Sequence, residues 1–351
     1  RATRQRMTAR AGEAGLPRAR GEPARGRADQ ARPAELLVSI VNYRTAEMTI
    51  AALRSVLADR GGIDLRVAVV DNRSGDGSAE AIADWIAARD PPVPVELLRS
   101  ATNSGFSGGH NRGIAAGAAE FYLLLNSDAE LRPGCLAALL AAARAAPGAG
   151  LVAPRLEHAD GQVQTSSFRD LSPASEVIRG AGSGPVTRLL SRFEVALGPD
   201  PGAAPIGWVS FAAALIRAEA LAAAGPMDEG YFLYFEDADY CRRLRAAGWD
   251  IARAPRARVV HHRGGSAPVK ALAAARRRLP AYYYAARTRY FRLAHGRLGP
   301  LAANLGWHLG RLIAQGRRLF GKPVPPAVEA EWRDIWTNFA DPLGDRRAPE
   351  D

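Results

Sequence analysis

Three acidic side chains stand close together at Glu236, Asp237 and Asp239, directly after a run of five large apolar residues at 231–235. Like charges crowded beside apolar side chains raise one another's pKa, and a carboxylate with a raised pKa can act as a general base near neutral pH. A helix is expected to begin here, and its dipole also favours acids in the first turn. We therefore predict a catalytic role for Asp237 and helix capping for Asp239.

A further acid, Asp128, ends the segment Asn126-Ser127-Asp128 that follows an apolar run at residues 121–125. A carboxylate at the end of a buried strand is a suitable ligand for a hard cation, and Mg²⁺ or Mn²⁺ often bridges such a carboxylate to substrate phosphates. A simple turn role for Asp128 fits the spacing equally well. The segment is a candidate metal site whose alternative is a polar turn.

Two neighbouring histidines, His261 and His262, end another short β-branched run. Successive side chains of a strand point to opposite faces, so only one of the two can face a site. A neutral imidazole there could complete a metal shell. The pattern by itself favours an ordinary surface or packed pair.

Polar residues also follow the first two apolar runs of the chain. They are Asn42 and Tyr43 after the first run, and Asp71 and Asn72 after the second. Any one of these could make a turn or cap a helix. Because the segment at Asn126 follows a third run in the same way, three strand ends together favour a site for a nucleoside and its phosphates.

The segment at residues 103–113 is rich in glycine and precedes an alanine-rich helix. Glycines let a backbone approach a ligand closely, and exposed N–H groups at a helix start favour anions. The segment matches neither the P-loop nor the Rossmann fingerprint, so taken alone it is a weak signal. Its candidate contacts with a substrate are Asn103, Gly105, Phe106, Gly109 and Asn111.

The elements that must position these residues alternate along the chain. Apolar runs of strand length are separated by alanine-rich stretches with helical spacing, which predicts an α/β fold with a mostly parallel sheet flanked by helices. Such sheets bind ligands beyond the C-terminal ends of their strands. The predicted strands are 36–41, 67–70, 121–125 and 209–216, and the predicted helices include 45–57, 78–88 and 135–146.

The second half of the chain shows a weaker pattern. Residues 180–205 are rich in Gly, Pro and Ala and are predicted to form a loop. Residues 271–320 have helical spacing, with aromatic side chains between arginines. The aromatics of residues 332–339 are expected to pack onto the body of the protein.

The net charge of +11 is unevenly distributed. Residues 1–34 carry +6 and residues 264–328 carry +12, which leaves −7 for the remainder. Basic flanks can meet an anionic membrane face, whereas an acidic centre suits a cation and argues against a nucleic-acid groove.

Composition also limits the class of protein. The two cysteines, Cys135 and Cys241, are too isolated for a zinc site or a disulfide framework. There is no uninterrupted apolar stretch of about 20 residues, so no spanning helix is predicted. Residues 1–34 lack the apolar core of a secretory signal and are expected to be disordered, with a transit peptide as the alternative.

Taken together, the motifs resemble the family 2 glycosyltransferases with a GT-A fold, and most closely the rhamnosyltransferase-type enzymes of bacterial polysaccharide assembly. They occur in the same order over residues 36–266, and the ordered set is far more specific than any one motif. The segments that carry the resemblance are 38–43, 70–78, 103–113, 125–128, 207–210, 232–239 and 261–266.

The resemblance implies a role for each candidate residue. Asp237 matches the inverting general base, and Asp128 matches the last position of the DxD metal motif, in which Asn126 replaces the first Asp. His261 matches a histidine that completes the metal shell in some relatives, with His262 as the runner-up, and Trp208 resembles an acceptor-side residue. The residues expected to contact substrate are Asn42, Tyr43, Asp71, Asn72, Asn103, Gly105, Phe106, Gly109, Asn111, Asn126, Ser127, Trp208 and Glu236.

The resemblance also implies an organisation and a setting. A basic disordered segment at 1–34 precedes a GT-A domain at 35–267 and a basic helical extension at 268–351. The extension is expected either to lie at an anionic membrane surface or to pack on the catalytic domain as an ordinary helical pair. The expected substrates are a nucleotide-diphosphate sugar, with dTDP-rhamnose as the first choice, and a saccharide or polyprenyl-linked acceptor. A divalent metal, Mg²⁺ or Mn²⁺, is the expected cofactor. The enzyme would work in the cytoplasm, peripheral to the inner face of the plasma membrane. The alternatives are a nucleotidyltransferase or a catalytically inactive, membrane-binding relative.

Overall fold

The computed structural model describes residues 32–202, 204–262 and 269–349. The predicted disorder of residues 1–34 therefore falls almost entirely outside the described residues, as do positions 263–266 of the last motif and the predicted domain boundary at 267 and 268.

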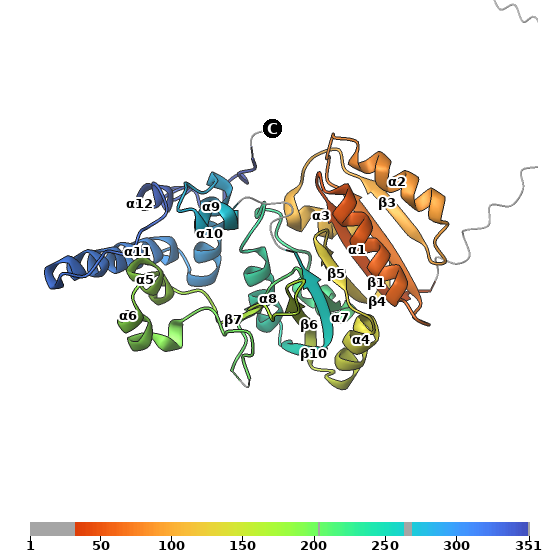
Figure 1. The fold of residues 1–351 in the computed structure, drawn as a ribbon, viewed down its shortest axis with the longest axis horizontal. Helices are drawn as coiled ribbons and strands as arrows, with labels where there is room; N and C mark the ends of the chain where they lie inside the picture. Colours follow the sequence, from red (N-terminus) through yellow and green to blue (C-terminus); the bar gives the residue numbers. More distant parts are fainter. Residues whose placement is uncertain (1–31, 203, 263–268, 350–351) are drawn as a thin grey trace, which may run out of the picture. The chain divides into compact units, whose positions relative to one another are not determined.

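The first half of the main sheet is parallel and follows the strand–helix alternation of the sequence (Figure 1). β1 pairs with β2 on one side and with β4 on the other, and β2 pairs with β3. All four strands consequently end at one edge of the sheet, where Asn42, Asp71 and Asn126 stand. The strands are β1 (Ala34–Asn42), β2 (Leu65–Asp71), β3 (Val95–Arg99) and β4 (Ala119–Asn126).

The second half of the sheet is mixed. β9 runs antiparallel to both of its neighbours, β4 and β6, while β10 pairs parallel with β6 and antiparallel with β5. The complete order is β3-β2-β1-β4-β9-β6-β10-β5. The added strands are β5 (Ala129–Leu131), β6 (Ala149–Glu157), β9 (Ala213–Arg217) and β10 (Asp250–His261).

Helices cover both faces of the sheet because strand side chains alternate between them. Leu36, Val38 and Ile40 of β1 pack in the core beneath α1, α2 and α4. On the other face, Ser39 hydrogen-bonds to His110 of α3, and α7 and α8 cover β4, β6 and β9. The helices are α1 (Ala46–Asp59), α2 (Ser78–Arg89), α3 (Gly105–Ile114), α4 (Cys135–Ala145), α7 (Ala218–Ala224) and α8 (Glu236–Ala246).

The prediction of one strand at residues 209–216 was wrong. β8 (Trp208–Val209) pairs with β7 (Ser167–Phe168) in a separate two-stranded sheet, and β9 begins only at Ala213. The chain turns at Phe211 and Ala212, both of which are buried. An apolar run reports burial but not direction, so it does not separate one strand from two that meet at a turn.

The predicted loop at 180–205 also contains more structure than expected. α5 (Pro173–Ala181) reaches into it, and α6 (Gly184–Leu189) and a 3₁₀ turn, η1 (Ser191–Phe193), follow. Proline at the start of both helices supplies a fixed φ where no backbone donor is needed, and this local signal outweighed the overall Gly and Pro content.

The predicted helical character of residues 271–320 is confirmed. The aromatics Tyr282, Tyr284, Tyr290, Phe291 and Trp307 are buried between these helices and the body. Within the described ranges, no helix combines the length and apolarity needed to cross a membrane. The helices are α9 (Val269–Ala274), α10 (Ala281–His295), α11 (Gly299–Gly316), η2 (Arg317–Phe320) and α12 (Glu331–Asp334).

Not all of the later aromatics pack as predicted. Trp336 and Phe339 contact each other, but Trp332 is 64% exposed. Ile335, one turn further along, is fully buried instead. A four-residue helix turns only one side towards the body, and α12 turns Trp332 away from it.

A buried ion-pair network fixes the C-terminal helices to α5. Arg287 of α10 donates from Nη2 to Oε2 of Glu176 at 2.8 Å and from Nη1 to Oδ1 of Asn304 at 2.7 Å. Arg179 bridges Glu176 to Glu331 of α12. Burial alone would raise the pKa of Glu176, but the two arginines outweigh it and hold the pKa at about 2. The network therefore stays ionised at neutral pH and keeps α10 in place.

Candidate active site

A cavity of about 1180 Å³ opens at the edge where the parallel strands end. Twelve of the sequence-predicted site residues line it, and they come from segments far apart in the chain. Its size is sufficient for a ligand larger than a typical drug molecule. The predicted residues that line it are Tyr43, Asn72, Asn103, Gly105, Phe106, Asn126, Ser127, Asp128, Trp208, Glu236, Asp237 and His261.

Asn42 and Asp71 lie just beneath this lining and are occupied with each other. The Asn42 amide donates from Nδ2 to Oδ1 of Asp71 at 2.8 Å, and its own Oδ1 accepts from the hydroxyl of Thr49 at 2.9 Å. Asp71 also accepts from the hydroxyl and the backbone N–H of Ser74. This network fixes the ends of β1 and β2 and the loop that follows Asp71.

Gly109 and Asn111 also lie away from the lining and connect α3 to its surroundings. A Cβ atom at Gly109 would clash with the Val41 side chain, so this glycine lets α3 pack closely on β1. Asn111 exchanges two hydrogen bonds with the backbone of Met227, at 2.9 and 3.0 Å.

The Asn103–Gly105 turn is held against β2 by Asn72. The Asn72 amide donates to Oδ1 of Asn103 at 3.0 Å and to the carbonyl of Gly105 at 2.9 Å. Gly105 has φ +71°, and a Cβ atom there would run into the backbone of Phe232. Both the conformation and the space require glycine at this position.

Asp128 and His261 meet at the floor of the cavity. Nε2 of His261 lies 3.5 Å from Oδ1 of Asp128, and both side chains are almost completely buried. His262 points the other way and pairs with the exposed Glu130 at 2.7 Å. The alternation along β10 thus brings His261, rather than His262, to the cavity.

Asn126 adds an oxygen to this part of the cavity. Its Oδ1 is buried and has no hydrogen-bond partner among the residues that the structure describes. A buried amide oxygen without a partner is costly unless a ligand or cation satisfies it. A carboxylate, an imidazole and an amide oxygen form a donor set that suits Mn²⁺ or Mg²⁺.

Glu236 and Asp237 begin α8 and also line the cavity. Burial raises the pKa of Asp237 to about 7, against the opposing effects of the Ala238 N–H bond at 2.9 Å and the charge of Lys270. Burial and the neighbouring Asp237 raise the pKa of Glu236 well above its usual range. The pKa rise predicted for this cluster is therefore found at Glu236 and Asp237, with burial as its main cause.

The predicted capping role of Asp239 was wrong. Its carboxylate accepts from Arg242 at 2.7 Å and from Arg243 at 3.1 Å, and no side chain caps the start of α8. A partner three or four residues further along the same helix lies on the same face, so these ion pairs were available locally.

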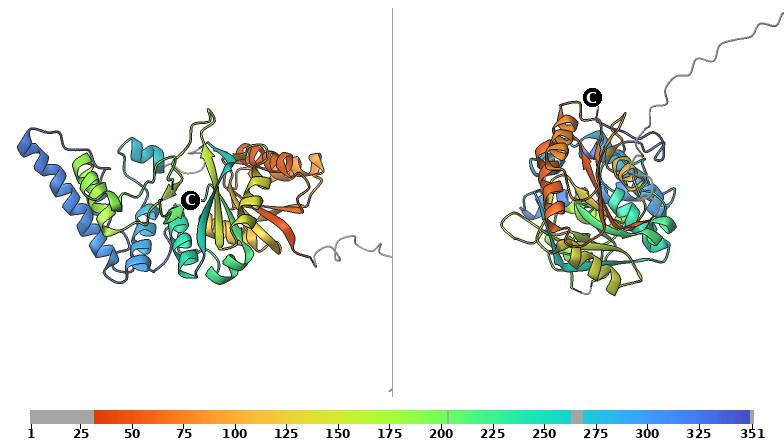
Figure 2. Two further views of the ribbon diagram at one scale, coloured as in Figure 1. Left: turned by 90° about the horizontal axis from the view of Figure 1, so that it is seen from below. Right: turned by 90° about the vertical axis from the view of Figure 1, so that its right-hand side faces the viewer.

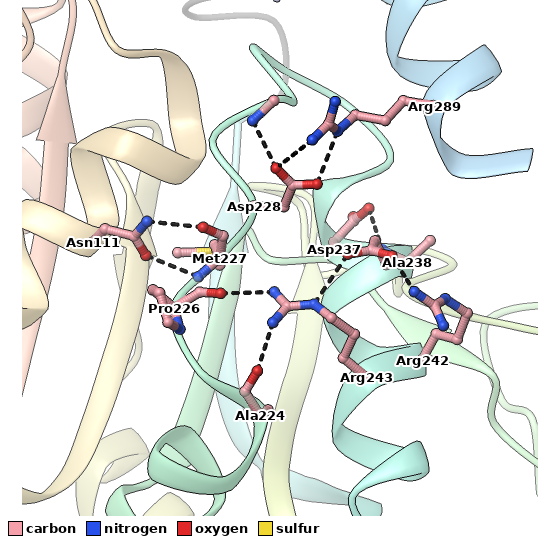
Figure 3. Close-up of polar contacts among 12 residues, drawn as sticks. Asn111, Ala224, Pro226, Met227, Asp228, Asp237, Ala238, Arg242, Arg243 and Arg289 are labelled. Carbon is pink, nitrogen blue, oxygen red and sulfur yellow. Dashed lines mark hydrogen bonds and ion pairs between the residues drawn. The ribbon is translucent and has the colours of Figure 1, made fainter. Parts of the chain in front are cut away.

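The backbone before these acids is strained and firmly anchored. Tyr234 and Phe235 have φ values of +73° and +68°, which large side chains seldom adopt and which cost roughly 1–3 kcal/mol each. The loop that leads into them is held from three helices, as Figure 3 shows. The anchors are Asn111 on Met227, Arg243 on the carbonyls of Ala224 and Pro226, and Arg289 on Asp228.

A sequence model described as glycosyltransferase-like family 2 matches residues 33–285, which is most of the chain. The chain belongs to this family. It is therefore a glycosyltransferase.

The chain is also similar in sequence to individual named glycosyltransferases. It is 32% identical over 277 residues to an N-acetylglucosaminyl-diphospho-decaprenol L-rhamnosyltransferase of Mycobacterium tuberculosis, covering 71% of this chain and 80% of that one. It is 22% identical to a low-salt glycan biosynthesis hexosyltransferase of Haloferax volcanii, covering 65% and 67%.

The fold has a solved counterpart. A mannosyltransferase of Pyrobaculum calidifontis, determined with GDP-Man and Mn²⁺, aligns with a TM-score of 0.52 at 16% identity and covers 90% of this chain and 86% of its own. The predicted GT-A fold, with a mostly parallel sheet between helices and a helical C-terminal part, is confirmed.

Several aromatic side chains line the cavity. Trp208 stacks on Phe168 with ring centroids 4.1 Å apart, and its indole N–H donates to the carbonyl of Arg169 at 2.9 Å. Tyr282 of α10 and Tyr234 also line the cavity. Flat aromatic faces beside the acids of α8 are suited to packing against a sugar ring.

Several lining residues were missed by sequence reasoning. Lys270 brings positive charge, and the Gln164 amide donates to the backbone carbonyl of His261 at 2.7 Å. Ala348 and Pro349 close one side, where Arg346 donates to the carbonyl of Ser104 at 2.7 Å. Single basic residues in an arginine-rich segment give no local signal, and a short tail shows no period at all.

Proposed function

We propose that this glycosyltransferase inverts the sugar that it transfers, and that Asp237 is its base. The observation that carries the proposal is that Asp237 lines the same cavity as the Asp128–His261 pair. Asp237 accepts the proton of an acceptor hydroxyl while that oxygen attacks the anomeric carbon. The nucleoside diphosphate leaves from the opposite face, so a single displacement inverts the configuration.

We propose that Asp128 and His261 hold a divalent cation, with Asn126 near it. When bound, the cation stabilises the negative charge on the departing diphosphate. Among the described residues, no group of three or more His, Cys, Asp or Glu side chains converges on one point. The remaining ligands would therefore come from the diphosphate and water.

The other lining residues have roles that follow from their positions. Asn72, Asn103, Gly105 and Phe106 lie at the ends of β2 and β3 and would contact the nucleoside, with Tyr43 nearby. Asn42 and Asp71 support them from beneath. Glu236 and Trp208 lie on the side where the acceptor would enter.

The donor and acceptor follow from the most informative relative. The mycobacterial protein is named for the transfer of L-rhamnose to a decaprenyl-diphosphate-linked N-acetylglucosamine. We infer by similarity that this chain uses dTDP-rhamnose and a polyprenyl-linked saccharide, at the inner face of the plasma membrane.

A panel of nucleotide sugars tests the proposal, with slow donor hydrolysis and nucleotide release as the readout. We expect one donor, dTDP-rhamnose, to be hydrolysed in the presence of Mn²⁺ or Mg²⁺ and to be stable without metal. Hydrolysis of a different donor would change the proposed donor sugar but would still support the transferase activity. Absence of metal-dependent binding of every donor would favour an inactive relative.

The pH dependence of transfer should report the pKa of Asp237. Since burial raises this pKa to about 7, the carboxylate becomes protonated as the pH falls through 7 and cannot accept a proton. We expect kcat to fall about tenfold per pH unit below that value. In Lys270→Gln the acidic limb of the pH–rate profile should shift to higher pH, because loss of the positive charge of Lys270 raises the pKa of Asp237 further. A rate that is flat from pH 5 to 8 would contradict Asp237 as the base.

A further inference from the structure

Helix α11 turns its small residues inward. Gly306 and Gly310 face α5, and a Cβ atom at either position would collide with a backbone oxygen of Pro173 or Val177. The glycines therefore allow the two helices to pack at backbone contact. Figure 2 shows α11 along one edge of the protein, beside α5 and α6.

The outward face of α11 is apolar, which reverses the usual pattern of a surface helix. Leu305, Leu309, Leu312 and Ile313 follow one another at intervals of four, three and one, so they form a single stripe. Leu312 is 66% exposed, and the exposed pair Leu319 and Phe320 follows in η2. We call these six side chains the α11 surface.

Exposed cations stand at both ends of the α11 surface. Arg297 precedes the helix, and Arg318 and Lys322 follow it. No acidic residue occurs anywhere between 264 and 328. The surface therefore combines a stripe of leucines with positive charge at each end.

We propose that the α11 surface docks the enzyme on an anionic lipid bilayer, with the helix lying in the plane of the interface. Leucine and phenylalanine enter the acyl boundary while arginine and lysine meet lipid phosphates. Docking on a bilayer would bring the enzyme to a lipid-linked acceptor, so this role rests on the acceptor given in the proposed function. Nucleic acid would use the cations but leave the leucines in water.

A second copy of the chain fits this surface less well than a bilayer. In a pair of α11 helices running either way, the cations of one copy would lie opposite cations of the other, because both ends are basic. Like charges placed together in this way oppose association.

Vesicle co-sedimentation of the whole protein tests the docking surface, with no donor or acceptor present. We expect binding to phosphatidylglycerol-containing vesicles, weak binding to phosphatidylcholine alone, and weakening by salt. The double variant Leu309→Gln/Leu312→Gln should bind about tenfold more weakly or worse, since each buried leucine contributes strongly. Arg318→Gln/Lys322→Gln should lose the preference for anionic lipid.

Met48→Gln, which changes an exposed apolar residue of α1, is the matched control and should bind like the parent. All variants should hydrolyse donor at the parent rate in solution, so a failed docking surface is distinguishable from a failed transferase site. Equal binding of parent and leucine variant to vesicles would overturn the proposal. So would a dimer in solution that the leucine variant dissociates, because it would assign the surface to a second copy.

Discussion

Asp237→Asn is expected to lower the rate of sugar transfer by roughly 10²–10⁴-fold, the usual contribution of a general base. Asparagine keeps the size of the side chain and an oxygen that can accept the Ala238 N–H, but it cannot take a proton from the acceptor. Donor binding should be close to that of the parent, because the proposed role of Asp237 is to act on the acceptor hydroxyl. Acceptor-dependent kcat and the Kd of the donor, measured separately, check both statements.

Stability and a neighbouring variant provide the controls. Because folding raises the pKa of Asp237 from 3.8 to about 7, ionising its carboxyl costs stability that is lost progressively as the pH rises between these values and is lost in full above 7. Asp237→Asn should therefore unfold at the same or a higher temperature at pH 8. Asp239→Asn should instead lower the unfolding temperature, because it removes the partner of Arg242 and Arg243. Full transfer activity in Asp237→Asn would remove this residue from the mechanism.

Asp128→Ala should lower metal-dependent turnover by roughly 10³-fold, since a bound metal lowers the free energy of the charged transition state by several kcal/mol. It should also weaken binding of Mn²⁺ measured with nucleoside diphosphate present, a readout that needs no turnover. The reason is that Asp128 supplies the carboxylate of the proposed donor set.

The two histidines form a matched pair for this test. His261→Ala should weaken Mn²⁺ binding in the same way, whereas His262→Ala should leave it unchanged, because His262 pairs with Glu130 away from the cavity. Equal effects of the two substitutions would argue that His261 acts through the structure of β10 and not on the metal.

Much of the candidate site could be predicted because the C-terminal ends of parallel strands can be recognised from short stretches of sequence. A polar residue after an apolar run marks the C-terminal end of a strand, and Asn72, Asn126 and Asp128 all reached the cavity by that rule. The same rule could not distinguish a residue that faces the ligand from one beneath it. Asn42 and Asp71 lie beneath the lining because they are paired on neighbouring strands and hydrogen-bond to each other.

Long-range pairing accounts for what the sequence could not show. The insertion of β9 between β4 and β6 depends on contacts between segments many residues apart, and no local period encodes it. The same holds for Lys270 and Pro349, which reach the cavity only through the packing of the C-terminal helices. The exposed stripe of α11 was likewise hidden, because helical spacing does not tell which side faces the protein.

The residues that line the cavity are synthesised at different times. Chains emerge from the ribosome N-terminus first, so Val41, Asp128 and Asp237 are made well before Tyr282 and Pro349, which line the same cavity. A nascent chain that has just completed α8 contains Asp128 and Asp237 but lacks the lining residues of α10. Arg289, which anchors the loop before those acids, is also still to come. The complete lining of the cavity is therefore present only near the end of synthesis.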